Sequence, residues 1–315
     1  MKQRDIDRIN SIKSGKFGVE VEMYDIRREY AARVVANFFG TTASVEWTGG
    51  TYDKWICRDA QGRKWEFMRD SSIVDGHGGC EMVTPVLEYN DIEMLQEVIR
   101  VLRKNGAKSD PSHDCGIHVH VDASAQTPAT LRNLANIMKS HDNLILNAIG
   151  VTSERRRWCY PVNDNFIIQL NNKKPSTMEG VKKVWYESQG YSISGEFDHY
   201  NHSRYNILNL HSYWQGKGIE FRCFQFDNPT AEKKGGLHAG QLKAYIQLCL
   251  AICEKAKSSK FSKRTVSDLQ EENPRRAIYK WMRRMGMKGE EFATARTVFT
   301  RNLKRVTRTR ETVAA

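Results

Sequence analysis

Two histidines on alternate positions of a short apolar run are the first residues in the sequence that could do chemistry. Within residues 114–124, DCGIHVHVDAS, the stretch IHVHV predicts a β-strand. Because strand side chains alternate between two faces, His118 and His120 lie on one face and the aliphatic residues on the other. Two such imidazoles can share a metal ion or a phosphate, but half-buried strands also carry histidine for structural reasons. The motif alone leaves both interpretations open.

Carboxylates and an arginine follow the same alternating pattern in two other segments. GVEVE places Glu20 and Glu22 on one face of a strand, and GIEFRCF places Glu220 and Arg222 together opposite an apolar face. Neighbouring carboxylates repel each other and need a cation when they are buried. Carboxylates and imidazoles suit hard divalent cations, and arginines suit phosphate oxygens. The combined pattern predicts a Mg-nucleotide site on the concave side of a curved sheet.

Three further segments add polar groups of the same kinds. RYNILNL predicts a strand with Arg204 and Asn206 on one face. Glu81 stands in EMVTP, at the start of a short strand that ends at Pro85. Asp70 precedes two serines, where a simple Asx turn is the alternative to a functional role.

The elements that must position these side chains are interspersed strands and helices, which predicts an α+β fold. Several strands are expected to be antiparallel hairpin partners. Amphipathic patterns, caps and glycine stops predict helices in four segments, namely 28–40, 90–106, 127–150 and 237–257. Residues 151–200 are polar and aromatic, and they predict an elaborate loop with short helices that recognises the substrate.

The positive charge of the 315-residue chain is concentrated near its C-terminus. The net charge is +12, and residues 260–315 contribute +9, from 15 Lys or Arg against 6 Asp or Glu. We therefore predict a main domain at 1–258 and a basic helical extension at 259–315. A solvated helical face explains the extension, and a phosphate-rich partner is the alternative. Trp281 could stack on a base, but Ile278, Met282 and Met285 join it in an apolar stripe that predicts packing against the main domain.

Several classes of protein are disfavoured by the sequence. No apolar run approaches the roughly 18 residues that span a bilayer, and the charged N-terminal segment lacks the pattern of a signal peptide. These features predict a cytoplasmic protein without a membrane partner. The seven cysteines form no CxxC pair, so we expect reduced, mostly structural thiols. The loop motifs GxxxxGK[ST], GxGxxG and GxSxG are absent from the sequence.

The order of the motifs resembles that of the amidoligase family. The matching order is GVEVE, a tryptophan strand with D-x-S, E-x-V-T-P, CG-x-HVH, R-x-N and E-F-R, from about residue 17 to about residue 255. These carboxylate–amine ligases are related to glutamate–cysteine ligase. The resemblance implies a glutamine-synthetase-like fold, in which a curved, mainly antiparallel sheet forms a half-barrel funnel backed by helices. The C-terminal helical appendage is similar to that of some phage and bacterial members.

The resemblance also implies roles for individual residues. The metal ligands would be Glu20, Glu22, Glu81, His118 and Glu220. The nucleotide would contact His118, His120, Arg222 and Asn206, and the catalytic residues would be Arg222, Arg204 and Glu22. The family commonly has D-G-S where this chain has Asp70-Ser71-Ser72, which leaves the role of Asp70 open. One of Arg155, Arg156 and Arg157 would match an arginine that follows the long helix in the family.

The resemblance implies an ATP-dependent carboxylate–amine ligase that forms an amide or peptide bond through an acyl phosphate. Its cofactors would be ATP and Mg²⁺, with Mn²⁺ as an alternative metal. Its partners would be a small-molecule or peptide carboxylate and an amine, with nucleic acid as a possible partner of the basic extension. Two alternatives stay open: a zinc-dependent hydrolase that uses the HVH strand, and a nucleic-acid-binding or structural protein on an inactive ligase fold.

Overall fold

One antiparallel sheet forms the centre of the molecule. The structure, a computed structural model, describes residues 2–76, 78–228 and 236–304. In this part of the chain nine strands pair in the order β2-β3-β4-β5-β1-β7-β9-β8, and β6 pairs with β1. All the ladders between them are antiparallel. The strands are β1 (Lys16–Met23), β2 (Glu46–Gly49), β3 (Lys54–Arg58), β4 (Lys64–Met68), β5 (Cys80–Val83), β6 (Leu87–Glu88), β7 (Ile117–Val121), β8 (Leu208–Asn209) and β9 (Ile219–Phe224).

Strand alternation gives the central strands β1, β7 and β9 one apolar face and one polar face. Val19, Val21, Val119 and Phe221 are all at most 1% exposed and belong to the main core. Side chains at the intervening positions lie on the opposite face, because successive strand residues point to opposite sides. The alternation predicted from the sequence is confirmed for these strands.

Helices pack on the apolar face and supply the rest of the core. Helix α2 packs on β3 and β4, α9 packs on β7, and α3 and α4 both pack against α9. Thr127 caps the start of α4, and left-handed glycines follow the ends of α2 and α4. The helices predicted from the sequence are therefore confirmed as α2 (Arg28–Phe39), α3 (Ile92–Lys104), α4 (Pro128–Ile149) and α9 (Ala239–Ser258). With the sheet, they confirm the α+β class.

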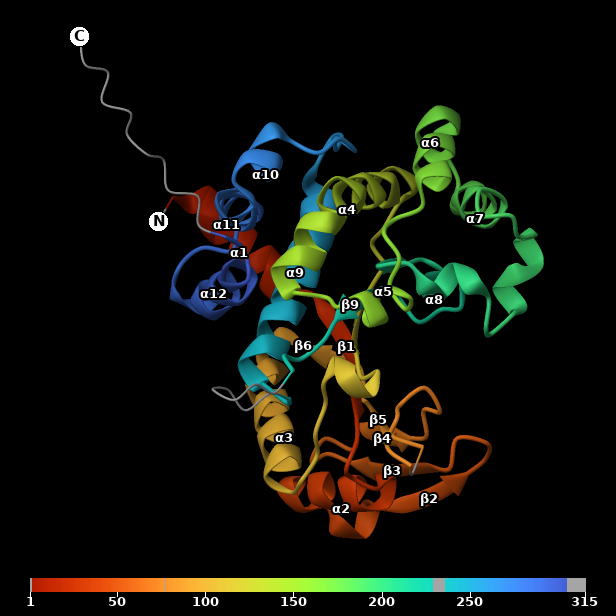
Figure 1. The fold of residues 1–315 in the computed structure, drawn as a ribbon, viewed down its shortest axis with the longest axis vertical. Helices are drawn as coiled ribbons and strands as arrows, with labels where there is room; N and C mark the ends of the chain where they lie inside the picture. Colours follow the sequence, from red (N-terminus) through yellow and green to blue (C-terminus); the bar gives the residue numbers. More distant parts are fainter. Residues whose placement is uncertain (1, 77, 229–235, 305–315) are drawn as a thin grey trace.

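Apart from the short strand β8, residues 151–214 form a set of short helices at one end of the sheet (Figure 1). They are α5 (Ser153–Arg156), α6 (Asp164–Lys173), α7 (Met178–Glu187), η4 (Ile193–Phe197), η5 (His202–Tyr205) and α8 (His211–Trp214). The strand predicted for RYNILNL is wrong in its first half. Residues 202–205 form a 3₁₀ turn that the side chain of Asn201 caps, and the strand that follows is only Leu208–Asn209. Arg204 therefore lies on a turn and not on the sheet.

The C-terminal helices pack against the same core as the main domain. Helices α11 (Pro274–Met285) and α12 (Ala293–Arg301) contact α9 and α4, and Figure 1 places them beside α1 (Gln3–Lys13). The apolar stripe of α11 is buried, with Ile278 and Met282 fully so, which confirms the predicted packing. The boundary between residues 258 and 259 stays a prediction, and residues 305–315 of the predicted extension lie outside the described residues. The remaining short helices are α10 (Asp268–Glu272), η1 (Thr42–Ser44), η2 (Tyr89–Asp91), η3 (Pro111–His113) and η6 (Glu290–Phe292).

Two further features concern the cysteines and the length of the helices. All seven cysteines are buried free thiols. Among the described residues, the helices are too short or too polar to cross a lipid bilayer.

Candidate functional site

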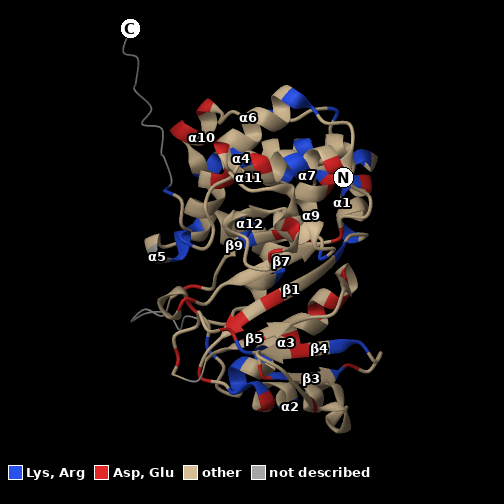
Figure 2. Cartoon of the chain, turned by 90° about the vertical axis from the view of Figure 1, so that its right-hand side faces the viewer, with Lys and Arg blue, Asp and Glu red and all other residues tan. Residues whose placement is uncertain are grey.

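Strand register brings the predicted acidic and imidazole side chains together on the polar face of the sheet. Glu20 pairs with His118 across β1 and β7, and Glu22 pairs with Glu81 across β1 and β5. His120 pairs with Glu220 across β7 and β9. Figure 2 shows acidic positions along β1 at the middle of the sheet. Four segments distant in sequence thus contribute to one site, which we call the carboxylate cluster: Glu20, Glu22, Glu81, His118, His120 and Glu220.

Glu20 is the central acceptor of the carboxylate cluster. One of its oxygens lies 2.8 Å from Nδ1 of His118, and the other lies 3.0 Å from Nε2 of His120. His118 is 3% exposed and also has Nε2 3.6 Å from Glu22 and Nδ1 3.6 Å from Glu220. Each imidazole therefore faces at least one carboxylate, and neither histidine lies in an apolar environment.

Backbone and amide groups fix the two most buried carboxylates. The amide N–H of Gly116 donates to one oxygen of Glu22. Asn209, on β8, donates from Nδ2 to Glu220 at 2.6 Å. Directional hydrogen bonds of this kind hold a carboxylate in one orientation and compensate part of its lost hydration.

The charges in the cluster shift the pKa values of its members in opposite directions. Desolvation raises the pKa of Glu20, but the neighbouring His120 and His118 outweigh it and hold that pKa well below its usual range. Desolvation opposes protonation of His120, but Glu20 and Glu220 raise its pKa to about 9. Desolvation together with repulsion from Glu20 raises the pKa of Glu81 well above its usual range. The cluster thus combines a stable anion, a cationic imidazole and a carboxyl group that resists ionisation.

Three overlapping groups of side chains have ligand atoms close enough to hold a metal ion. In each group the atoms lie within 4.8 Å of one another. The groups are Glu20 with His120 and Glu220, Glu20 with Glu81 and His118, and Glu22 with Asp70 and Glu81. Oxygen ligands with one or no imidazole suit a hard divalent cation such as Mg²⁺ or Mn²⁺. The donor set therefore fits the metal that the sequence resemblance implies. No group among the described residues contains both histidines, which the HVH zinc alternative would need.

The groups include two residues that the sequence did not assign as metal ligands. Asp70 forms the Asx turn, accepting from the amide and the hydroxyl of Ser72 at 2.8 and 2.7 Å. It also stands in a possible ligand group, so the turn and a ligand role are compatible. His120 belongs to such a group as well, whereas the sequence had favoured His118 as the metal ligand.

Two buried arginines supply positive charge beside the carboxylates. Arg222 donates from Nη1 to Glu220 at 2.5 Å, and Arg155 has Nη1 3.8 Å from Glu22 and Nη2 3.4 Å from Nε2 of His118. The Nε atoms of both arginines are buried and have no hydrogen-bond partner among the described residues. Buried donors without partners are costly unless a ligand satisfies them. Both arginines are therefore candidates for contact with an anionic ligand.

The structure also selects among the three consecutive arginines. Arg155 is 2% exposed and reaches the carboxylate cluster, whereas Arg157 pairs with Asp114 and Arg156 donates to Asn147 on the surface. Among the three, Arg155 is the one whose guanidinium contacts the cluster.

Two of the predicted site residues do not contact the carboxylates in the described structure. Arg204 stacks over the rings of Tyr200 and Tyr205 and donates to the carbonyl of His199. The side chain of Asn206 donates to Gln189 and to the carbonyl of Ser203. The predicted shared strand face of Arg204 and Asn206 is therefore wrong, because the turn at 202–205 breaks the alternation. Arg204 remains close to the site through Tyr205, whose ring also faces Arg222.

The sequence pattern missed Asn209 and the amide of Gly116. Asn209 stands in the same segment as Arg204, but a strand that started at residue 204 would put these two side chains on opposite faces. Because the strand starts at Leu208, Asn209 lies directly opposite Glu220. Gly116 was visible in the sequence only as part of CG-x-HVH, and no side-chain pattern reveals a backbone donor.

Gly116 leaves the space that the Arg155 side chain fills. A Cβ at residue 116 would lie 1.5 Å from Nη2 of Arg155 and 2.2 Å from its Cζ. We expect Gly116→Ala to displace the guanidinium, to lower the free energy of unfolding by about 1–3 kcal/mol, and to reduce any activity of the site at least about tenfold. Urea unfolding followed by circular dichroism measures the stability change.

The matched control is Gly240→Ala at the start of α9. Its Cβ would meet Thr294 at 3.4 Å, an ordinary contact, and alanine favours a helix. We expect equal or slightly higher stability for this variant. If Gly116→Ala unfolds at the same urea concentration as the control, Arg155 is not held as described.

A hollow of about 500 Å³ adjoins one end of the carboxylate cluster. Glu20 and His120 line it on the side of the cluster, and apolar side chains that include Val83 and Val86 line its walls. The loop 216–218, Gly-Lys-Gly, forms another side and accepts a hydrogen bond from Nδ1 of His120 at the carbonyl of Lys217, at 3.2 Å. An apolar cavity next to a polar cluster is typical of sites for small molecules and cofactors.

The comparison with protein families agrees with the motif order. Residues 13–253 match the model of a protein family described as "Putative amidoligase enzyme". Among solved structures, the crystal structure of a bifunctional glutathione synthetase from Pasteurella multocida is similar, with 12% sequence identity and a TM-score of 0.45. The similarity covers 96% of this chain and 49% of that chain, so this chain spans about half the length of that protein. No curated protein matches the sequence.

Proposed function

The chain belongs to the amidoligase family, and from that membership we propose that it is an ATP-dependent carboxylate–amine ligase. The observation that carries the proposal is the meeting of four carboxylates, two imidazoles and two buried arginines on one face of the sheet. In this proposal the sheet is the curved half-barrel of glutamine-synthetase-like ligases, residues 1–258 are the catalytic domain, and the polar face is the interior of the funnel.

ATP and an acidic substrate bring several negative charges to a site that is itself acidic. Divalent ions such as Mg²⁺, bound by the three ligand groups that the carboxylate cluster forms with Asp70, would neutralise the phosphates and polarise them for transfer. Arg222 and Arg155 would complete the neutralisation from the protein side, since each has a buried Nε donor to offer. Glu20, whose pKa is well below its usual range, stays anionic at neutral pH and anchors both histidines.

The hollow beside the cluster is the proposed place for the nucleoside of ATP. Its apolar walls suit a flat aromatic base, and the end lined by Glu20 and His120 places the phosphates next to the ligand group of Glu20, His120 and Glu220. Lys217, on the exposed loop that lines this hollow, could reach a phosphate oxygen. The opposite end of the cluster, near Glu81 and Asp70, is left for the carboxylate substrate.

The proposed reaction has two steps that balance in atoms and charge. First, an oxygen of the substrate carboxylate attacks the γ-phosphorus, the bond to the β-phosphate oxygen breaks, and ADP leaves an acyl phosphate behind. Second, the amine nitrogen attacks the acyl carbon, the tetrahedral intermediate expels inorganic phosphate, and the nitrogen loses a proton to a base. Arg222 and Arg155 would stabilise the charge on the transferred group. Arg204, on the turn at residues 202–205, could hold the substrate carboxylate.

Oxygen tracing provides the sharpest test of this proposal. The protein is incubated with Mg-ATP, hydroxylamine as a generic amine, and pools of amino acids and acidic peptides labelled with ¹⁸O in their carboxylates. We expect carboxylate-dependent ADP release, formation of a hydroxamate, and one ¹⁸O atom in the released phosphate. Glu22→Gln is expected to abolish all three signals, and division of the active pool identifies the substrate.

Other outcomes would contradict the proposal. Phosphate without ¹⁸O in an active pool would exclude the acyl phosphate. Failure to bind Mg-ATP by isothermal calorimetry would exclude the ligase. Amide hydrolysis that needs zinc and no nucleotide would instead support the hydrolase alternative.

A further inference from the structure

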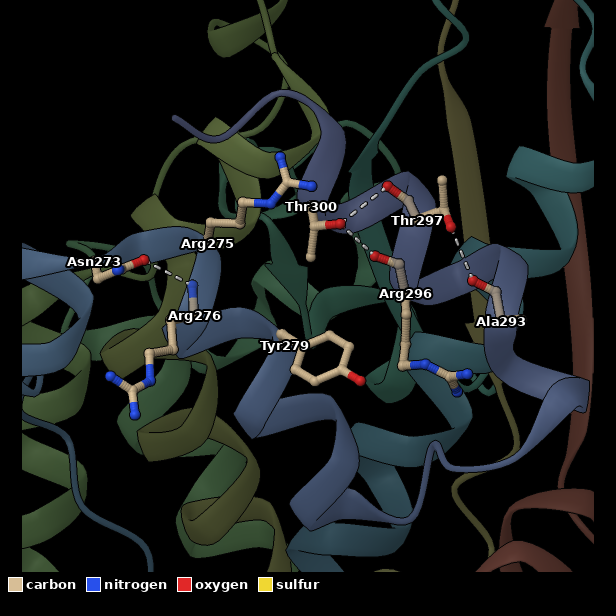
Figure 3. A pocket seen from close by; sticks show the side chains of 8 residues that line it. All are labelled: Asn273, Arg275, Arg276, Tyr279, Ala293, Arg296, Thr297 and Thr300. Atoms are coloured by element: carbon tan, nitrogen blue, oxygen red, sulfur yellow. Dashed lines mark hydrogen bonds between the residues drawn. The ribbon is translucent and has the colours of Figure 1, made fainter. Parts of the chain in front are cut away.

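A second polar surface lies on the C-terminal helices and plays no part in the proposed ligase reaction. Two adjoining hollows, of about 560 and 580 Å³, share Arg276 and Tyr279 as lining residues. The first lies between α11 and α12, where Figure 3 shows the ring of Tyr279 between Arg276 on one side and Arg296 on the other. The second continues from α11 towards Arg8 of α1 and Lys288. We call the surface formed by both hollows the α11 surface.

Positive charge on the α11 surface is largely uncompensated. Neither hollow has an aspartate or a glutamate in its lining. Among the described residues, the side chains of Arg275, Arg276, Lys280 and Arg284 have no ion-pair partner, whereas Lys288 pairs with Asp5 at 2.7 Å. Uncompensated charges on one face repel each other, and a polyanion that binds across them removes this repulsion.

An exposed aromatic ring lies in the middle of this charge. Tyr279 is 40% exposed, lines both hollows, and has the guanidinium of Arg283 over its ring at 5.7 Å. Trp281, the ring that the sequence offered for stacking, is half-buried and stacks on His141 at 4.1 Å. Tyr279, and not Trp281, is therefore the ring available to a ligand.

We infer that the α11 surface binds single-stranded nucleic acid, with its arginines on the phosphates and Tyr279 stacked on a base. The two adjoining hollows provide room for several nucleotides, and arginine predominates over lysine on the surface, which suits bidentate phosphate contacts. An exposed ring within a basic groove is the arrangement that binds unpaired bases, whereas bases in a duplex do not expose their faces. A membrane surface fits less well, because Tyr279 is the one large apolar side chain exposed in the lining.

The test measures the fluorescence anisotropy of a labelled 20-nucleotide oligo-dT as the full chain is added. It is repeated between 50 and 300 mM NaCl, at about 20 °C below the melting temperature of the protein. The variant is Arg276→Gln with Arg284→Gln. We expect its affinity to fall at least about tenfold at 100 mM NaCl, and the slope of log affinity against log salt to decrease by about 1.4, since each phosphate contact contributes about 0.7. The matched control removes two charges from α6 and α7, with Lys173→Gln and Lys183→Gln, and should bind like the wild type.

Tyr279 separates stacking from charge attraction alone. Tyr279→Ala is expected to weaken binding about 5- to 100-fold with little change in the salt slope, and Tyr279→Phe should keep most of the affinity. The inference is overturned if the wild type does not bind at 50 mM NaCl, if the α6–α7 control weakens binding as much as the α11 variant, or if Tyr279→Ala binds normally. Binding to anionic vesicles in place of oligo-dT would also overturn it.

Discussion

Replacing Glu20 by glutamine is expected to lower ATP-dependent ligation about 10²- to 10³-fold. Glu20 stands in two of the three possible ligand groups and accepts hydrogen bonds from both histidines. Glutamine keeps the size of the side chain and one oxygen, but it removes the negative charge that a divalent ion and two imidazoles share. The loss should therefore appear in kcat and in metal affinity, and not in the secondary structure. Steady-state kinetics with a Mg²⁺ titration, together with circular dichroism, measures these effects.

Glu66→Gln is the matched control for this experiment. Glu66 lies on β4 and pairs with Lys54 and Lys64 at 2.6 and 2.5 Å, outside the possible ligand groups. We expect its activity to stay within about twofold of the wild type. An equal loss of activity in both variants would mean that the effect comes from general electrostatics of the sheet. Full activity of Glu20→Gln would remove Glu20 from the site.

The faces of the central strands could be predicted from the sequence because strand geometry is local. A period of two places Glu20 and Glu22 on the face opposite Val19 and Val21 wherever the strand occurs in the fold. The order of strands in the sheet is not local. That β1 lies between β5 and β7, which puts Glu81 and His118 on either side of Glu20 and Glu22, became visible only in the structure.

The segment around Arg204 shows why the remaining parts of the site were not predictable. Its alternation of polar and apolar residues is compatible with a strand, but Asn201 caps a 3₁₀ turn and shifts the start of the strand to Leu208. A shift of this kind exchanges the residues that face the site, so Asn209 takes the position that Asn206 was expected to hold. Arg155 could not be separated from its two neighbours, because its selection depends on the space above Gly116, which is a tertiary contact.

Replacing Glu81 by glutamine is expected to stabilise the protein without metal and to weaken its stabilisation by Mg²⁺. Glu81 faces Glu22 across the ladder and shares one ligand group with Glu20 and another with Glu22 and Asp70. Without a cation, these carboxylates repel one another, so a neutral side chain at residue 81 removes an unfavourable interaction. We expect the variant to gain about 1–2 kcal/mol of unfolding free energy at pH 8 in EDTA, which corresponds to about 1.5–3 °C in Tm for a chain of this length. The Glu81→Gln variant also loses one ligand oxygen in two of the three possible metal-ligand groups.

The pH dependence of this gain has a definite sign. Desolvation and repulsion raise the pKa of Glu81 well above its usual value of 4.5. Between the unfolded and the folded pKa, the folded protein therefore holds a proton that the unfolded chain has released. Stability therefore falls as the pH rises from the unfolded pKa through the folded one. The advantage of Glu81→Gln should be small near pH 5 and grow towards pH 8. Glu66→Gln should show no such advantage, because Lys54 and Lys64 outweigh desolvation and lower the pKa of Glu66.

Thermal unfolding of the wild type and of both variants, with EDTA or with 10 mM Mg²⁺ at pH 5.5 and pH 8, tests the Glu81 prediction. Because Mg²⁺ binds the ionised form, it should raise the Tm of the wild type and of Glu66→Gln, and more so at pH 8. In Glu81→Gln the rise should be smaller, because only the group of Glu20, His120 and Glu220 stays intact. A Glu81→Gln protein that is less stable than the wild type at pH 8 in EDTA would show that Glu81 is not under repulsion. A Mg²⁺-induced rise in Tm as large in Glu81→Gln as in the wild type would show that Glu81 is not a metal ligand, because Glu81 enters two of the three groups that the described side chains can form.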